Sequence, residues 1–338
     1  MGLLSRVYFN AVFGGLGGLI GWMLFGVFGD SLAWVASQLG DLSKADHIQA
    51  LLGGAIIGGS IGYFVVGVEA LRDQALVKFC RLATYGVILG ALGGALGMWL
   101  GDQVNYRLVE QYGARRFLVA LLARGVGWMV LGLAVGFSEG IAARSLGKLS
   151  YGTIGGALGG FVGGVLFVLL YMWAVAQTPT GLLARFVASD SWAALAGAAG
   201  LVILGACIGA LSALVQAVFQ PACVRVLRGW QEGREYPLDR TESQLGRDEA
   251  ADVLLLRDMK VEKRHALIRR EEDRFVLVNH APPEQTQVNG TPVIEDQVLE
   301  DGDRIQLGNV VLRFQLKAAR VKQRRALQLA NLPSLPAR

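Results

Sequence analysis

The stretch "GACIGALSALVQAVFQPACVRVLRGWQEGREYPLDR", residues 205–240, changes character at Pro221. Before this proline most residues are small or apolar and none carries a charge. After it, acids and bases alternate with apolar residues. A shift of composition along a chain marks a domain boundary. The sequence therefore predicts two domains of different class that meet near Pro221.

The residues upstream of this boundary have the composition of a membrane domain. The 338-residue chain is 53% hydrophobic and only 17% charged, whereas soluble domains are about 25% charged. Crossing a bilayer core about 30 Å thick takes roughly 20 helical residues, and six apolar stretches are long enough. We therefore predict an α-helical membrane bundle over residues 1–220, with spans at approximately 7–29, 51–71, 82–101, 117–143, 153–175 and 193–219.

The distribution of Lys and Arg around these spans predicts their orientation, since cytoplasmic loops are enriched in positive residues. Most of the basic residues near span ends fall on one side of the bundle, although segment 102–116 places three arginines on the other. We expect both termini in the cytoplasm and the bundle among the lipids of a bacterial inner membrane. The basic residues on the cytoplasmic side are Arg6, Arg72, Lys78, Arg81, Arg144, Lys148, Arg225, Arg228 and Arg234.

Glycines recur in the spans with a regular pattern. The odd-numbered spans contain "GGLGG" (14–18), "GALGG" (90–94) and "GALGG" (156–160). Glycines four residues apart share one helix face and let neighbouring backbones approach closely. The pattern predicts three copies of one helical hairpin, each about seventy residues long. In the even-numbered spans the glycines are Gly54, Gly58 and Gly62, then Gly132, Gly136 and Gly140, then Gly205 and Gly209. Glu69, Glu139 and Gln216 follow seven residues after Gly62, Gly132 and Gly209.

Four polar residues inside the spans are candidate functional positions: Glu69, Glu139, Gln216 and Arg124. Ionisable groups within a span are costly and usually functional, which favours a ligand or transport pathway. The two acids also lie near the cytoplasmic ends, where they can reach headgroup water or pair with Arg72 or Arg144. Arg124, near an outer end, is expected to snorkel or to pair within the bundle. For these residues, a role in a ligand or transport pathway and a structural role at the membrane interface both remain open.

Downstream of the boundary the hydrophobic period changes to two. Short runs rich in Val, Ile, Leu and Phe are separated by polar turns, as in an all-β sandwich. The runs are "DVLLLRD", "HALIRRE", "RFVLVNH", "RIQLGNV" and "VLRFQL". We predict a cytoplasmic linker at 221–239, a β-sandwich at 240–318 and a basic tail at 319–338.

Residues 240–318 resemble a forkhead-associated (FHA) domain. The resemblance covers about a quarter of the chain and implies a β-sandwich whose loops at one end bind phosphothreonine peptides. Several spaced motifs in the family's order carry it. They are "LGR" (245–247), "VEKRHALI" (261–268), "RFVLVN" (274–279), "TQVNG" (286–290) and "LEDGDRIQLG" (299–308).

The resemblance also implies which residues bind the partner, and several depart from the family pattern. Glu262 and Pro282 replace serines, Glu284 replaces an asparagine, and Asn279 stands where aspartate is usual. A carboxylate in contact range repels phosphate, and we expect Glu262 to pair with Arg247. Phosphothreonine recognition and phosphate-independent docking therefore both remain open. The partner-binding candidates are Arg247, Glu262, Lys263, Arg264, Glu284, Thr286 and Asn289; Gly246, His265 and Gly290 are expected to be structural.

The sequence does not resemble that of an enzyme. It lacks a nucleophile with a base at readable spacing, its three histidines are scattered, and its three cysteines lack metal-ligand spacing. We therefore predict no catalysis, metal or cofactor, and, without a nucleic-acid-binding motif, no nucleic-acid partner.

Two functions remain. The first is a membrane adaptor or scaffold, homo-oligomeric or part of a membrane complex, whose FHA-like domain docks a cytoplasmic protein within a kinase-linked signalling or secretion assembly. The alternative is a channel or transporter subunit gated or recruited through that domain.

Overall fold

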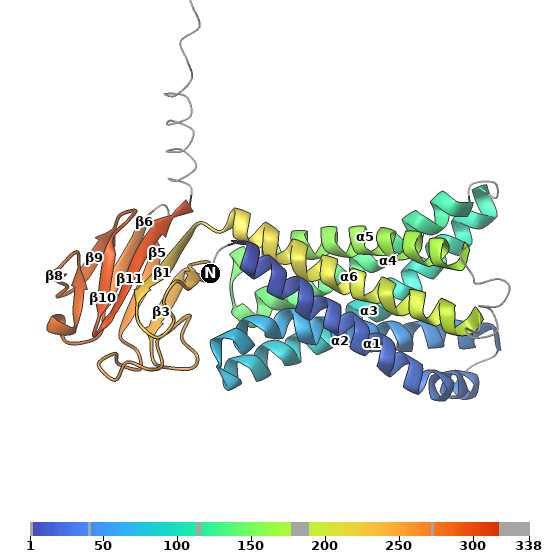
Figure 1. Ribbon diagram of the computed structural model, residues 1–338, viewed down its shortest axis with the longest axis horizontal. Coiled ribbons are helices and arrows are strands. Elements are labelled where there is room, and N and C mark those ends of the chain that lie inside the picture. The colour runs from blue at the N-terminus through green and yellow to red at the C-terminus, as the bar shows by residue number, and fades with distance from the viewer. Residues whose placement is uncertain (1–2, 40–41, 113–115, 177–188, 272–273, 318–338) are drawn as a thin grey trace, which may run out of the picture. The chain divides into compact units, whose positions relative to one another are not determined.

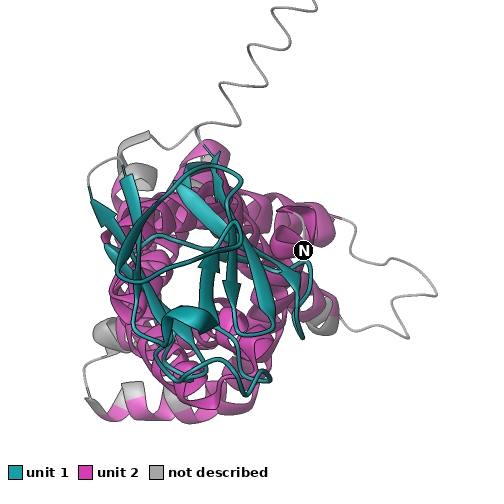
Figure 2. Cartoon of the chain, turned by 90° about the vertical axis from the view of Figure 1, so that its left-hand side faces the viewer, with its two compact units in different colours: residues 1, 219–338 teal, residues 2–218 magenta. Residues whose placement is uncertain are grey.

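The computed structural model describes residues 3–39, 42–112, 116–176, 189–271 and 274–317 (Figure 1). The predicted basic tail at 319–338 lies outside these residues. The chain divides into two compact units, one of residues 2–218 and one of residues 219–338 together with residue 1 (Figure 2). Each unit has its own hydrophobic core. The division falls beside Pro221, where the composition of the sequence changes.

The first unit is the predicted bundle of long apolar helices. All six helices of its described residues are long and apolar enough to cross a membrane, which confirms the predicted fold class. Their length follows from uninterrupted apolar sequence of roughly 20 residues or more. The helices are α1 (Leu3–Leu39), α2 (Leu42–Asp73), α3 (Leu76–Tyr112), α4 (Arg116–Ala143), α5 (Leu146–Ala176) and α6 (Ser189–Phe219).

The glycines of this bundle lie at its tightest helix contacts. A methyl group on Gly58 of α2 would overlap the backbone oxygen of Gly90 in α3. The same holds for Gly136 of α4 against Gly152 of α5. Gly205 of α6 meets Gly14 of α1 in the same way, although the two residues are far apart in sequence. The glycine contacts therefore join α2 to α3, α4 to α5 and α6 to α1.

The centre of the bundle is supplied mainly by the even-numbered helices. Ile61 of α2, Leu131 of α4 and Ile208 of α6 are each 0% exposed and belong to one hydrophobic cluster. Large apolar side chains on the odd-numbered helices, such as Leu92 and Leu158, are instead exposed at the surface of the unit. An apolar exterior of this kind suits contact with lipid.

The second unit is a sandwich of two sheets, as predicted. One sheet has the strand order β2-β1-β11-β10-β7-β8 and the other the order β4-β3-β5-β6-β9. Within the unit the fully buried side chains include Leu245, Leu277, Ile305 and Phe314. The strands are β1 (Ala222–Arg228), β2 (Glu235–Pro237), β3 (Glu242–Gly246), β4 (Val253–Leu254), β5 (Ala266–Glu271), β6 (Arg274–Asn279), β7 (Thr286–Val288), β8 (Thr291–Pro292), β9 (Asp296–Leu299), β10 (Arg304–Leu307) and β11 (Val310–Leu316).

The sandwich begins earlier than the sequence pattern indicated. Residues 221–239, predicted as a linker, form β1 and β2, and β1 pairs with β2 on one side and β11 on the other. Ala222, Cys223, Val224 and Val226 are buried while Arg225 is exposed, so β1 shows the alternation of a half-buried strand only from Val224 onward. The strand was missed because it follows directly on α6 and its exposed positions are arginines.

Candidate functional site

Two loops meet closely at one end of the sandwich because Gly246 has no side chain. The Arg247 N–H donates to the carbonyl of Glu262 at 3.1 Å, and the Asp248 N–H donates to the carbonyl of Lys263 at 3.1 Å. A methyl group on Gly246 would overlap the Lys263 carbonyl oxygen. The absence of a side chain at Gly246 lets the two loops approach each other, and this places Arg247 beside residues 262–264.

His265 anchors these loops from inside the sandwich, where it is fully buried. Its Nδ1 accepts from the Glu262 N–H at 3.0 Å, and its Nε2 lies 3.0 Å from the Thr286 hydroxyl. The Thr286 hydroxyl in turn donates to Asn279 Oδ1 at 2.7 Å. Neutral histidine protonated at Nε2 satisfies all these bonds. Burial lowers the pKa of His265 below its ordinary value, although a hydrogen bond with the Gln285 backbone and the carboxylates of Glu262 and Asp258 act in the opposite direction.

Asn279 completes this network and fixes the segment that follows β6. Its Nδ2 donates to the carbonyls of Ala281 at 2.9 Å and Val293 at 2.8 Å. Its Oδ1 accepts from the Ala281 N–H at 3.2 Å as well as from Thr286. An aspartate, usual here in the FHA pattern, would place an acceptor against two carbonyl oxygens. The asparagine at position 279 therefore suits the two carbonyl oxygens beside it better than the aspartate of the FHA pattern would.

The two loops and residues 280–282 surround an open depression with a volume of about 700 Å³. Glu262, Lys263 and Arg264 are exposed at its rim. Arg264 lies 3.9 Å from the Asp248 carboxylate, both being partly exposed, and pairs of this kind contribute little to stability. The residues that carry its chemistry are Arg247, Glu262, Lys263, Arg264, His280 and Pro282.

The expected ion pair between Arg247 and Glu262 is not formed in the described part of the chain. The Arg247 Nε instead donates to the Val261 carbonyl, and its Nη1 lies 3.4 Å from the Met259 sulfur. The sequence could not show this, because the loop backbone turns the guanidinium toward residues 259–261. In the described residues Glu262 therefore does not form a contact ion pair with Arg247.

Two other candidates lie elsewhere than expected. Thr286 is 0% exposed and supports His265, so it does not face a partner. Asn289 has a φ of 53° and Gly290 a φ of 86°, as in a two-residue hairpin turn. The Asn289 side chain bonds Asp303 at 2.8 Å and the Arg304 N–H at 2.9 Å, at the other end of β7 from Thr286. Glu284 is exposed, in the short 3-10 turn Pro283–Gln285.

The polar residues of the bundle form two groups of contacts in the first unit. Lys148 Nζ lies 2.8 Å from a Glu69 oxygen, and Lys78 Nζ lies 3.7 Å from the other. Gln216 donates to Glu139 at 2.6 Å and accepts from the Arg6 guanidinium at 3.1 Å. We call these six residues the polar ring: Arg6, Glu69, Lys78, Glu139, Lys148 and Gln216.

Each of the six helices contributes one residue to the polar ring. Among the described residues neither Glu69 nor Glu139 pairs with Arg72 or Arg144, the partners that the sequence suggested. Arg6, Lys78 and Lys148 recur near the starts of the odd-numbered helices, a spacing that would have identified them beside the recurring acids. Arg124 is not part of the ring; it pairs with Asp102 at 3.1 Å and contacts the Met98 sulfur at 3.6 Å.

The second unit is thus a β-sandwich with a charged depression between loops at one end. A family described as the cytoplasmic domain of an inner membrane component of the T3SS matches residues 225–318. An oxoglutarate dehydrogenase inhibitor of Corynebacterium diphtheriae is 35% identical over 109 residues, which are 31% of this chain and 75% of that protein. The second unit of the chain belongs to the FHA-domain family.

Other relatives match a smaller part of their own length. The glycogen accumulation regulator GarA of Mycobacterium tuberculosis is 36% identical over 28% of this chain and 56% of that protein. Among solved structures, the FhaA FHA domain complexed with the intracellular domain of Rv3910 is 30% identical, with a TM-score of 0.25, over 28% of this chain and 99% of that chain. FHA domains bind phosphorylated protein partners, and the families found are binding or regulatory proteins.

Proposed function

We propose that this protein is a membrane-embedded adaptor whose FHA domain docks a phosphorylated segment of a cytoplasmic protein. The observation that carries the proposal is the depression at the loop end, where Arg247, Lys263 and Arg264 gather beside Asp248 and Glu262, and where the Arg247 Nε donates to the Val261 carbonyl and not to Glu262. Cations and N–H donors are what a phosphate group needs. His265 and Asn279 hold the surrounding loops in place, so little conformational freedom is lost on binding.

The six apolar helices support an anchoring role for the first unit. The match to the cytoplasmic domain of an inner membrane component supports a bacterial inner membrane, with both termini in the cytoplasm. It also supports a place in a larger membrane assembly, either as a homo-oligomer or beside other subunits. Because the docked segment is phosphorylated, the proposal includes a kinase that phosphorylates the partner protein.

The test uses the full chain in lipid nanodiscs and a library of phosphothreonine peptides with their unphosphorylated counterparts, titrated by calorimetry. We expect binding only with the phosphate present, and loss of binding in Arg247→Ala. Glu262→Ser should tighten binding because it removes a like charge from the rim. Arg274→Ala, an exposed arginine on β6 outside the depression, is the matched control and should bind normally. Equal affinity for both peptide forms would instead establish a phosphate-independent dock.

A second function has one observation in its favour. The polar ring places ionisable groups inside segments long enough to span a membrane, and such groups often mark transport pathways. A channel or transporter subunit, gated or recruited through the FHA domain, is therefore the alternative. In the described residues the acids of the ring contact bases or an amide, and Ile61, Leu131 and Ile208 pack in the core nearby. These contacts favour a structural role for the polar ring over a role in a transport pathway.

A further inference from the structure

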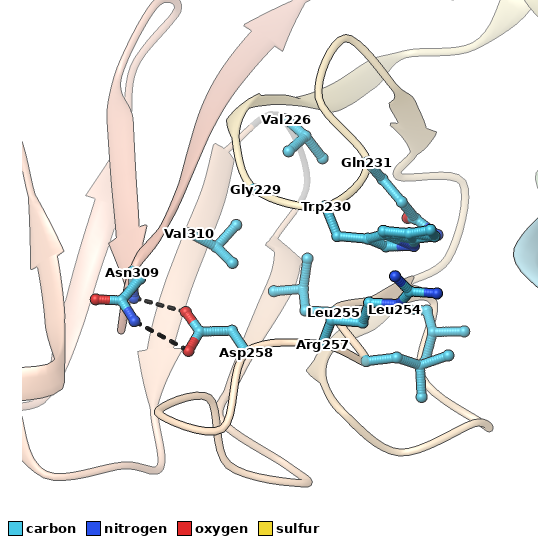
Figure 3. A pocket seen from close by; sticks show the side chains of 11 residues that line it. Val226, Gly229, Trp230, Gln231, Leu254, Leu255, Arg257, Asp258, Asn309 and Val310 are labelled. Carbon is cyan, nitrogen blue, oxygen red and sulfur yellow. Dashed lines mark hydrogen bonds between the residues drawn. The ribbon is translucent and has the colours of Figure 1, made fainter.

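A second surface lies beside the charged depression and has a different chemistry. It is an apolar pocket of about 260 Å³ bordered by the end of β1, the β1–β2 turn, residues 254–258 and the turn before β11. Figure 3 shows Val226, Leu255 and Val310 grouped around it, with Trp230 at one side. Drug-sized ligands occupy about 300–1,000 Å³, so this pocket is suited to one bulky side chain.

The walls of this Trp230 pocket are held in place by specific contacts. Gly229 has a φ of 144°, a conformation that L side chains rarely adopt, and it turns the chain so that Trp230 projects from the hairpin. The Arg257 guanidinium lies over the Trp230 ring, 3.2 Å from its centroid. On the other side, Asp258 accepts from the Asn309 N–H at 2.7 Å and from its side chain at 3.2 Å (Figure 3).

Exposure and charge indicate what the pocket binds. Trp230 is 49% exposed although its neighbours Leu255 and Val310 are 6% and 5% exposed. Tryptophan and arginine placed together at a pocket rim are the residue types that dominate protein interfaces. Arg228, Arg257 and Lys260 are exposed around the pocket, whereas Asp258 already accepts bonds from Asn309 and the Lys260 N–H. Glu232 is an exposed acid in the adjoining turn. Arg257 and Asp258 line the pocket, and with Arg228, Lys260 and Glu232 near its lining residues in sequence there are three bases and two acids, a net charge of +1.

We propose that the Trp230 pocket is a second docking site, which receives one bulky apolar side chain from an acidic segment of a soluble protein partner. Its basic rim attracts the acidic residues, and its apolar walls bury the side chain. The site needs no phosphate, so it goes beyond the docking function proposed for the depression. Residues 255–258 of the pocket and 262–264 of the depression belong to one connection between β4 and β5, so one partner is able to engage both.

Fluorescence anisotropy on the full chain in neutral-lipid nanodiscs tests this proposal. The probes are labelled, unphosphorylated peptides Glu-Asp-Glu-X-Glu-Asp-Glu, with X as Ala, Leu, Phe or Trp. We expect at least about tenfold tighter binding with a large apolar X than with Ala, as for an interface anchor. Trp230→Ala and Arg257→Glu should each weaken it by at least about tenfold, and added salt should weaken it further. Arg274→Glu, the same charge reversal away from the pocket, should bind as the natural chain does.

Several outcomes would overturn the proposal. Equal affinity for X as Ala, or binding that survives both Trp230→Ala and Arg257→Glu, would show that charge alone attracts the peptide. Binding that emerges only after residues 318–338 are deleted would assign the pocket to the chain's own tail. Competition by a second copy of the chain would assign it to self-association. Loss of phosphothreonine-peptide binding in Arg247→Ala alone leaves this proposal standing, because that variant tests the depression.

Discussion

Asn279 shows how one side chain determines the shape of the candidate site. Its amide is fully used, since Nδ2 meets two carbonyl oxygens while Oδ1 meets an N–H and a hydroxyl. We predict that Asn279→Asp destabilises the sandwich by about 1–3 kcal/mol, the usual cost of leaving buried polar groups unsatisfied. Urea unfolding of residues 219–338 at neutral pH would measure the change.

The matched control for Asn279→Asp is Gln297→Glu. Gln297 is exposed on β9, and the same conversion of amide to carboxylate there should change the free energy of unfolding by less than about 0.5 kcal/mol. Equal effects of the two substitutions would mean that added charge, and not the lost donor, is responsible.

The buried His265 makes the stability of the sandwich depend on pH. Its pKa in the folded protein lies below the ordinary value of about 6.5, so the unfolded chain binds a proton at a pH where the folded chain does not. This contribution to stability is therefore fully present above about pH 6.5. It is lost as the pH falls from there through the lowered pKa. We predict a steeper loss of stability between pH 7 and 5 in the natural protein than in His265→Gln.

Urea unfolding across this pH range would test the prediction, with His280→Gln as control. His280 has an exposed side chain, so this variant controls for the loss of an imidazole as such. A natural protein whose stability rises on acidification, relative to His265→Gln, would contradict the assignment of a neutral buried imidazole.

At the scale of elements, the glycines determine how closely the helices pack. A methyl group on Gly136 would overlap the backbone of Gly152, and backbone cannot move aside as a flexible side chain does. We predict that Gly136→Ala destabilises the bundle by about 1–3 kcal/mol, as for overpacking. The matched control is Gly26→Ala in α1, where a methyl group meets nothing within 4 Å. It should be neutral or slightly stabilising, since alanine favours helix.

Thermal unfolding of the two variants in one detergent would measure this difference. If Gly136→Ala is as stable as Gly26→Ala, close approach of α4 and α5 is not what the glycine provides.

Local patterns predicted the elements far better than they predicted contacts. Apolar length and glycine spacing are readable within one helix, so the six helices and their glycine faces were predictable. The contact of Gly14 with Gly205 joins the two ends of the helical unit and leaves no local trace. The motifs located the loops around Arg247 and Glu262, but the direction of the Arg247 side chain depends on the backbone at Val261. Thr286 shows the same limit, because a motif does not distinguish a buried hydroxyl from an exposed one.

At the scale of the whole molecule, the chain consists of a helical unit and a sandwich unit that contains the candidate binding site. The polar ring links the helices in two groups of three. Glu69 joins α2 to α3 and α5 through Lys78 and Lys148, and Gln216 joins α6 to α4 and α1 through Glu139 and Arg6. Removing one partner of a buried pair is strongly destabilising because the other charge is left uncompensated. The ring therefore acts as a structural connection in the proposed adaptor, and as part of a pathway in the alternative.

The double variant Glu69→Gln, Glu139→Gln separates these two functions. We predict that its affinity for a phosphothreonine peptide stays within about twofold of the natural chain, because the depression is built wholly from residues 246–286. Its thermal stability should fall, since Lys78 and Lys148 lose their carboxylate at Glu69.

Reconstituted vesicles would provide both measurements, peptide binding outside and ion or proton flux across the bilayer. Arg247→Ala is the opposite control, with peptide binding lost and the bundle unchanged. A flux in the natural protein that disappears in the folded double variant would establish the transporter alternative, because Gln keeps the shape of Glu but not its charge. If the natural protein shows no flux and the double variant still binds the peptide, the result is the one that an adaptor requires. Anchoring and docking would then persist without the carboxylates of Glu69 and Glu139.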